Sequence, residues 1–290
     1  MENGHQLDSK IYEIYAFDGS QWELVYESPE WHFTRVFTPY DGIDKFLVMK
    51  ESPSSRQGLY EFETKTKTFK ELYTDPDFDL SWISYDRQTG IAAIEAHNPM
   101  PNYIYLEASG SAATVHQQLA AAFPEHYVNV TSYTEDETKL IFRVSSSQNP
   151  GTFYLFDRQK SQIRYLADYS PEMAALPFKK MEPFNFTSDD GLKIHGLFTP
   201  GVGQDSKGSV VIAHGGPHGP YDRWGFRGSV HFFSQLGYNV IQVNFRGSGG
   251  FGRKFEEAGY LEWSGKMIDD IIDGVRFISE KKNLPDARCI

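Results

Sequence analysis

The sequence predicts an all-β part that forms a portion of a β-propeller over residues 1–175, followed by an α/β part over residues 176–290. Three observations lead to this fold class. Before about residue 170, short runs alternate apolar and polar residues, as half-buried strands do. These runs recur at intervals of 45 to 49 residues. After residue 209, short apolar runs alternate with helical periodicity, which indicates a sheet whose strands are joined by helices.

Composition narrows the possible functions. The chain has 290 residues, is 40% hydrophobic and carries a formal net charge of −11. This charge argues against non-specific binding to nucleic acid or to an anionic membrane, because both require a basic surface. The single cysteine, Cys289, allows neither an internal disulfide nor a thiolate zinc site. We therefore expect no nucleic-acid or membrane partner, no metal and no cofactor.

The beginning of the chain does not resemble a signal peptide, because residues 1–20 contain acidic side chains and no apolar run. No stretch approaches the roughly 20 apolar residues of a membrane-spanning helix. We therefore expect a cytoplasmic location. The sequence does not predict an oligomeric state.

The repeats predict propeller blades. Tyr12, Tyr60, Tyr105 and Tyr154 lie 48, 45 and 49 residues apart. A second series precedes three of them at matching intervals: Leu47, Ala92 and Ile141 lie 45 and 49 residues apart. Four-stranded units that repeat at about 40–50 residues are typical of blades, and the part present would hold about three to four of them. An ordinary β-sandwich with irregular hairpins is the alternative.

Individual strands of the first part follow from alternation and turn residues. The expected hairpins and single strands are 11–15 with 22–26, 46–49, 59–62 with 69–73, 91–94, 103–106 before a turn at Gly110, 140–144, and 153–156 with 163–166.

The second part begins after the proline-containing segment 170–183. Its expected elements, in order, are a hairpin of 184–187 and 192–198 around Asp190-Gly191, a buried strand at 209–213, a helix at 230–236 closed by Gly237, a strand at 239–245, an amphipathic helix at 267–278, and the start of a strand at 288–290.

The tetrapeptide His214-Gly215-Gly216-Pro217 follows the predicted strand 209–213 directly. A glycine loop in this place of an α/β-hydrolase donates one backbone N–H to the oxyanion hole, which stabilises negative charge on a carbonyl oxygen in the transition state. A plain glycine-rich turn is the alternative. His214 and His218 are four residues apart, but the glycines between them exclude the helix that a zinc pair would need.

Residues 247–252 match G-x-G-x-x-G, the fingerprint of dinucleotide binding, with Asp269 and Asp270 about 20 residues further on. Two features weaken this interpretation. The acidic residue should end a second strand, whereas here both aspartates fall in the predicted amphipathic helix. The segment after Gly252 is also a weak, short helix. A nucleotide-binding oxidoreductase therefore stays a third, weaker hypothesis.

Three ordered motifs resemble the prolyl oligopeptidase family, and its acylaminoacyl-peptidase and dipeptidyl-peptidase branches most. They are residues 210–218, 237–240 and 243–252. The likeness covers residues 184–290 and extends to the Asp190-Gly191 hairpin and the helix with Asp270. It implies a serine peptidase of short peptides, an exopeptidase or an oligopeptidase, with a propeller in front of an α/β-hydrolase domain. It also explains residues 247–252 as a hydrolase loop.

The resemblance implies roles for particular residues. Gly216 would offer the oxyanion N–H, His214, Gly215 and Pro217 would shape its loop, and Arg246 would brace the site from the neighbouring strand. The family's Ser-Asp-His triad has no counterpart here, since no G-x-S-x-G occurs in the chain. In the family the nucleophile follows a helix like 267–281, so we expect residues 1–290 to be truncated before it and inactive alone. A non-catalytic module that binds peptides or proteins is the alternative.

Overall fold

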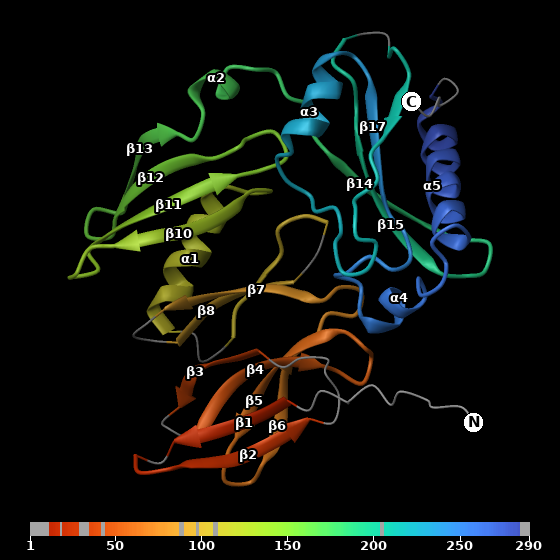
Figure 1. The fold of residues 1–290 in the computed structure, drawn as a ribbon. Helices are drawn as coiled ribbons and strands as arrows, with labels where there is room; N and C mark the ends of the chain where they lie inside the picture. Colours follow the sequence, from red (N-terminus) through yellow and green to blue (C-terminus); the bar gives the residue numbers. More distant parts are fainter. Residues whose placement is uncertain are drawn as a thin grey trace, which may run out of the picture. The chain divides into compact units, whose positions relative to one another are not determined.

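A computed structural model gives the structure of the protein (Figure 1) and describes residues 12–17, 19–28, 35–41, 44–86, 90–96, 99–106, 110–203 and 206–284. The chain forms two compact units, Met1–Ser81 and Trp82–Ile290. The domain boundary predicted between residues 175 and 176 lies inside the second unit and stays a prediction. The strand expected at 288–290 lies outside the described residues.

The first unit consists of antiparallel strands. β1 (Tyr12–Phe17) pairs with β2 (Trp22–Ser28), and β3 (Arg35–Asp41), β4 (Lys45–Glu51), β5 (Gln57–Glu63) and β6 (Thr68–Tyr73) follow one another in a four-stranded sheet. Val25, Val48 and Phe62 form its buried cluster, with Tyr26 and Phe69 packed against it. The strands predicted at 46–49, 59–62 and 69–73 are confirmed.

The second unit begins with two further sheets. β7 (Leu80–Asp86), β8 (Gly90–Ala96) and β9 (Tyr103–Ile104) form one, and β10 (Tyr127–Tyr133), β11 (Lys139–Ser145), β12 (Thr152–Asp157) and β13 (Gln162–Asp168) form the other. The turn predicted at Gly110 is wrong, because helix α1 (Gly110–Ala122) begins there. Its Val115 and Leu119 pack on Val128 and Phe142 of the β10–β13 sheet. Burial of this apolar side stabilises the helix.

The repeated intervals in the sequence correspond to repeated strand positions. Leu47 lies in β4 and Ile141 in β11, each the second strand of a four-stranded sheet. Tyr60 lies in β5 and Tyr154 in β12, each the third. The sheets β3-β4-β5-β6 and β10-β11-β12-β13 have the sequential strand order of propeller blades, but none of the described sheets is closed. A propeller beyond these sheets remains a prediction.

A mixed sheet with the order β14-β15-β17-β16 follows. It consists of β14 (Glu182–Thr187), β15 (Lys193–Thr199), β16 (Ser209–Val211) and β17 (Asn239–Asn244). Between its strands and after them lie helices α3 (Gly228–Gln235), α4 (Arg253–Glu257) and α5 (Lys266–Lys282), while the short α2 (Pro171–Ala174) precedes the sheet. β16 and β17 are parallel and joined through α3, as the alternation after residue 209 predicts.

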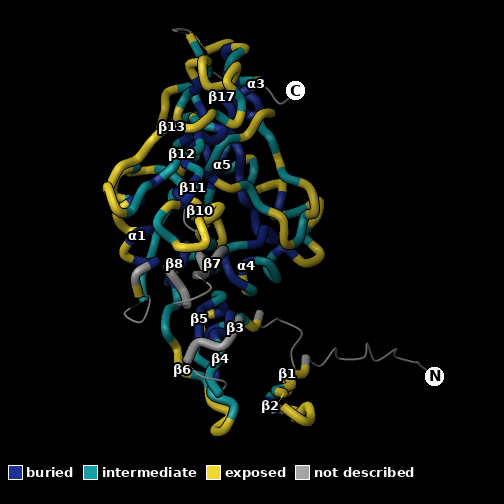
Figure 2. The backbone as a smooth tube through the Cα atoms, turned by 90° about the vertical axis from the view of Figure 1, so that its left-hand side faces the viewer, coloured by how far each residue is buried: buried dark blue, intermediate teal, exposed yellow. Residues whose placement is uncertain are grey.

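Helices cover both faces of this sheet. Every residue of β17 is buried (Figure 2), and α3 and α5 lie on opposite sides of it (Figure 1). Val230 of α3 packs with Leu197 and Val240. On the other face, Gly274 lets α5 approach Val243 closely. Such a covered sheet exposes the carboxyl ends of its parallel strands, where α/β proteins build their sites. Among the described residues, no helix is long and apolar enough to cross a membrane.

Candidate active-site loops

Two loops follow the carboxyl ends of the adjacent parallel strands β16 and β17: the 214–220 loop and the 246–252 loop. Two backbone hydrogen bonds join them. The N–H of Gly219 donates to the carbonyl of Gly247 at 3.2 Å, and the N–H of Gly249 donates to the carbonyl of Pro220 at 3.2 Å. The loops therefore form one structural unit at the edge of the sheet, although about 30 residues separate them in sequence.

The glycines of the 246–252 loop are required by this contact. A Cβ atom on Gly249 would lie 2.1 Å from the carbonyl oxygen of Gly219. Gly247 has a φ of +96°, and a Cβ there would lie 2.7 Å from the Cε of Met267. Protein atoms thus fill the space beside both glycines. This packing does not favour the dinucleotide hypothesis, because a pyrophosphate would need the same space.

Gly216 occupies the exposed part of the 214–220 loop. Its φ of +141° lies in a region that side chains rarely adopt, and a Cβ atom would lie 2.9 Å from the ring carbons of Pro220. Among the hydrogen bonds of the described residues, neither Gly215 nor Gly216 donates its N–H. Pro217 follows through a cis peptide bond and is half-buried. The loop therefore presents a backbone donor to solvent at the carboxyl edge of the sheet.

His214 fastens this loop to the neighbouring one. Its ring stacks on the ring of Phe245, with centroids 4.5 Å apart and planes 14° apart. Its Nδ1 lies 3.1 Å from the carbonyl oxygen of Gly215, and its Nε2 lies 2.7 Å from the hydroxyl of Ser248. His214 therefore links the 214–220 loop to Phe245 and Ser248 of the neighbouring chain segment.

The second histidine of the loop is engaged elsewhere. The Nε2 of His218 accepts a hydrogen bond from the indole N–H of Trp263 at 3.2 Å, and its ring meets Tyr260 edge-on. Within the part of the chain that the structure describes, no group of three or more His, Cys, Asp or Glu side chains is arranged to hold a metal ion.

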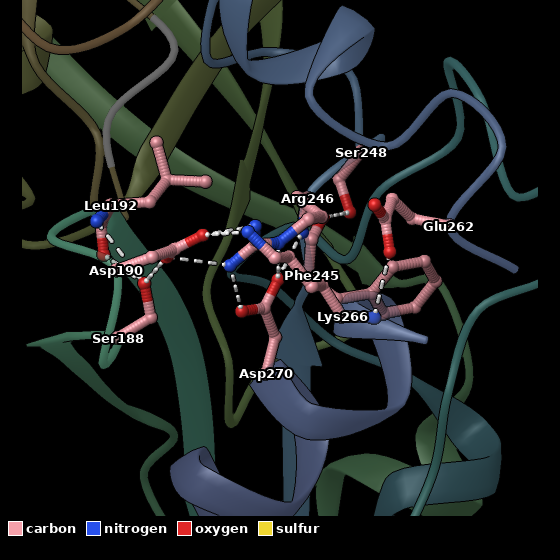
Figure 3. A network of polar contacts seen from close by, with 9 residues as sticks. All are labelled: Ser188, Asp190, Leu192, Phe245, Arg246, Ser248, Glu262, Lys266 and Asp270. Atoms are coloured by element: carbon pink, nitrogen blue, oxygen red, sulfur yellow. Dashed lines mark hydrogen bonds and ion pairs between the residues drawn. The ribbon is translucent and has the colours of Figure 1, made fainter. Parts of the chain in front are cut away.

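Arg246, at the end of β17, is buried and paired twice (Figure 3). Its Nε and backbone N–H donate to Oδ2 of Asp270 at 2.8 and 2.9 Å, and its Nη2 donates to Oδ1 at 2.8 Å. Its Nη1 and Nη2 also donate to the carboxylate of Asp190 at 2.7 and 3.0 Å. The Nζ of Lys266 donates to Asp190 at 2.7 Å. The arginine thus ties the β14–β15 turn and helix α5 to the start of the 246–252 loop.

These contacts set the protonation of the cluster. The hydrogen bond from Arg246, followed by those from Lys266 and Ser188, holds the pKa of Asp190 far below its usual range. Hydrogen bonds to Asp270 and Asp190 raise the pKa of Arg246 above its usual range. The Asp190 carboxylate and the Arg246 guanidinium therefore stay charged at ordinary pH values and do not exchange protons.

A half-buried carboxyl group, that of Asp222, follows the 214–220 loop. Burial raises its pKa, and the charge of His214 opposes this shift. Asn244 of β17 accepts a hydrogen bond from the backbone N–H of Asp222 at 2.7 Å and donates one to its carbonyl at 3.0 Å. The chain after the loop is therefore held to the central strand.

The sequence predicts both loops but not the side chains that contact them. It indicates Asp270 and Asp190 only as parts of a helix and a turn, and Ser248 only as a motif position. One signal was available for Asp270: it shares the buried stripe of α5 with Met267, Gly274 and Ile278. An acidic residue on an apolar stripe needs a buried cation as its partner.

Comparison with known families is consistent with this geometry. The model of the prolyl oligopeptidase family matches residues 224–290. Dipeptidyl aminopeptidase BIII of Pseudoxanthomonas mexicana is 33% identical over 159 residues, which are 52% of this chain and 23% of that protein. Dipeptidyl peptidase family member 6 of Caenorhabditis elegans is 29% identical over 191 residues, covering 57% of this chain and 25% of that protein. The predicted resemblance to the prolyl oligopeptidase family is therefore confirmed.

Solved structures share the fold over nearly the whole chain. Acylaminoacyl peptidase of Pyrococcus horikoshii superposes with a TM-score of 0.64 at 19% identity, covering 96% of this chain and 42% of that one. A puromycin-hydrolyzing peptidase of Mycobacterium tuberculosis superposes with a TM-score of 0.65 at 16% identity, covering 94% and 43%. The chain spans about a quarter of the curated relatives that it matches and under half of these structures.

Proposed function

We propose that this chain carries the oxyanion-loop portion of a serine peptidase of prolyl oligopeptidase type that hydrolyses short peptides. The observation that carries the proposal concerns Gly216, an exposed residue whose backbone N–H donates to no described residue. It lies in a loop that follows the carboxyl end of one strand of a parallel pair. The names of the similar proteins, which are peptidases, support the substrate class.

The proposed chemistry is hydrolysis of an acyl group. As a nucleophile attacks the peptide carbonyl, negative charge develops on its oxygen, and the N–H of Gly216 stabilises that charge by a hydrogen bond. In α/β-hydrolases the second donor is the backbone N–H of the residue after the nucleophile. Arg246 would act indirectly, without touching the substrate. Its ion pairs with Asp190 and Asp270 hold the 246–252 loop. That loop holds the 214–220 loop through the backbone hydrogen bonds of Gly247 and Gly249.

The nucleophile of the proposed reaction is not among residues 1–290, which contain no G-x-S-x-G. A fluorophosphonate probe, which reacts with activated serines, tests this. We expect no labelling of residues 1–290, and labelling of one serine in the product of the complete reading frame, read out by mass spectrometry of the labelled peptide. Labelling within residues 1–290 would contradict the assignment, and a complete product that never reacts would favour the non-catalytic binding module.

A further inference from the structure

Ser248 is a buried hydroxyl between the two loops. Its side chain has no exposed surface, and its Oγ lies 2.7 Å from Nε2 of His214 and 2.6 Å from the carbonyl oxygen of Phe245. The backbone N–H of Ser248 also donates to the Phe245 carbonyl at 3.0 Å. The hydroxyl therefore donates its one proton to the Phe245 carbonyl, and its oxygen accepts a hydrogen bond from the Nε2–H of His214.

The ring of His214 continues the chain of contacts to Gly215. A carbonyl oxygen only accepts hydrogen bonds, so the nitrogen facing it, Nδ1, carries a proton. Nε2 faces the oxygen of Ser248, whose proton is engaged with Phe245, so Nε2 also donates. The two ring hydrogen bonds fix the imidazole between Ser248 and Gly215.

His214 contacts the carbonyl of Gly215. This carbonyl and the N–H of Gly216, the candidate oxyanion donor, belong to the same peptide unit. The bond between Gly215 and Gly216 is trans, since the cis bond of this loop follows Gly216. A trans peptide is planar, with its C=O and N–H pointing in opposite directions. Holding the Gly215 oxygen therefore sets the direction of the Gly216 N–H. Without the contact from His214, the peptide unit between Gly215 and Gly216 would be unusually free to rotate, because glycine restricts the backbone least.

We infer that Ser248 and His214 are positioning residues that aim the N–H of Gly216, an inference that rests on the proposed function for its catalytic meaning. Ser248 orients the imidazole, and the imidazole holds the Gly215 carbonyl. Because that carbonyl and the Gly216 N–H share one planar peptide unit, the N–H is held in one direction. Neither side chain touches the reacting carbonyl. The stacking of His214 on Phe245 restricts the ring to this plane.

The test compares Ser248→Ala with Ser234→Ala in residues 1–290. Ser234 is a matched control, because it is equally buried and its hydroxyl donates to the carbonyl of Pro200 at 2.6 Å, with no contact to either loop. NMR of ring-labelled histidine and of glycine amides reports the His214 ring nitrogens and the Gly216 N–H. We expect S248A to change the His214 Nε2 signal, because its acceptor is lost, and to shift the Gly216 amide beyond any change in S234A.

A second variant tests the inference independently if S248A does not fold. His214→Phe keeps the stacking on Phe245 but removes both ring hydrogen bonds, so we expect the same Gly216 amide shift. An unchanged His214 Nε2 signal in S248A, or an unmoved Gly216 amide in either variant, would overturn the inference.

Kinetics separate this inference from the proposed function. In the complete reading-frame product, we expect S248A to slow fluorophosphonate labelling about ten- to a hundredfold, less than the roughly 10²–10³ for outright loss of an oxyanion donor. S234A should label at the unaltered rate. If no version labels, the proposed function fails while the NMR result stands. If S248A is labelled at the unaltered rate, the positioning role of Ser248 and His214 is overturned, while the proposed function stands.

Discussion

Arg246 is the charge around which the two loops are organised. Its side chain is 5% exposed and that of Asp270 is 1% exposed, so both charges lie almost entirely outside water. Such a pair adds little net stability compared with apolar residues, but removal of one partner leaves a buried charge uncompensated. The pairing therefore serves mainly to determine where the 246–252 loop begins.

Replacing Asp270 by Asn should show this dependence. Asn keeps the shape but leaves Arg246 with only the more exposed Asp190, so we expect the free energy of unfolding to fall by about 3 kcal/mol. Urea unfolding of D270N measures it. Asp269 is the matched control, since it is the neighbouring acid on the exposed side of α5, and D269N should change stability by less than about 0.5 kcal/mol. Equal effects of the two variants would refute the role given to the buried pair.

The limits of sequence reasoning are clear at these residues. The glycines of 214–220 and 246–252 signal tight turns after strands, so the loops could be located. Their contacts could not, because Arg246 pairs with residues 56 positions before it and 24 after it, and His214 meets Ser248 34 positions away. Only the folded sheet determines which of several nearby acids or hydroxyls becomes the partner.

Helix α5 and strand β17 show how whole elements hold the site. The periodicity of residues 267–278 predicted the helix, and α5 is observed at Lys266–Lys282. Alternation also predicted most strands. It did not predict α1, whose sequence is alanine-rich, nor strands β3, β7 and β10, and in β10 an irregularity between Val130 and Ser132 interrupts the alternation. In α1 the burial of Val115 and Leu119 against a distant sheet decides the structure, which local patterns do not report.

Gly274 sets the distance between α5 and the sheet. A Cβ atom there would lie 2.8 Å from Cγ2 of Val243 and 3.1 Å from Cε1 of Phe186. Alanine favours a helix over glycine by about 1 kcal/mol, but overpacking costs about 1–3 kcal/mol. We expect G274A to lower the free energy of unfolding by about 1 kcal/mol, measured in urea.

The control for that substitution is Gly228→Ala. Gly228 begins α3 and has no atom within 4 Å of its added Cβ, so G228A should be neutral or slightly stabilising. A G274A variant that is as stable as G228A would show that α5 can move away from the sheet without cost, contrary to the packing described.

The molecule as a whole combines antiparallel, blade-like sheets with a mixed sheet that helices cover. The order β14-β15-β17-β16 and the 0.64 TM-score to an acylaminoacyl peptidase describe a fold shared with much longer chains. Within it, the parts that we propose to serve catalysis are the two glycine loops and the charged cluster of Arg246, Asp190 and Asp270. The central claim is that Gly216 supplies a donor for a developing oxyanion.

The most direct test is the rate of fluorophosphonate labelling of the complete reading-frame product carrying Gly216→Ala. The added Cβ would press on Pro220 at a strained φ and turn the N–H away, so we expect the rate to fall by about 10²–10³. Gly208→Ala is the control, because Gly208 has a similar φ of +125° and open space at the other end of β16. If Gly216 supplies the donor, the labelling rate falls in G216A and not in G208A. Equal labelling rates in the two variants would contradict this role of Gly216.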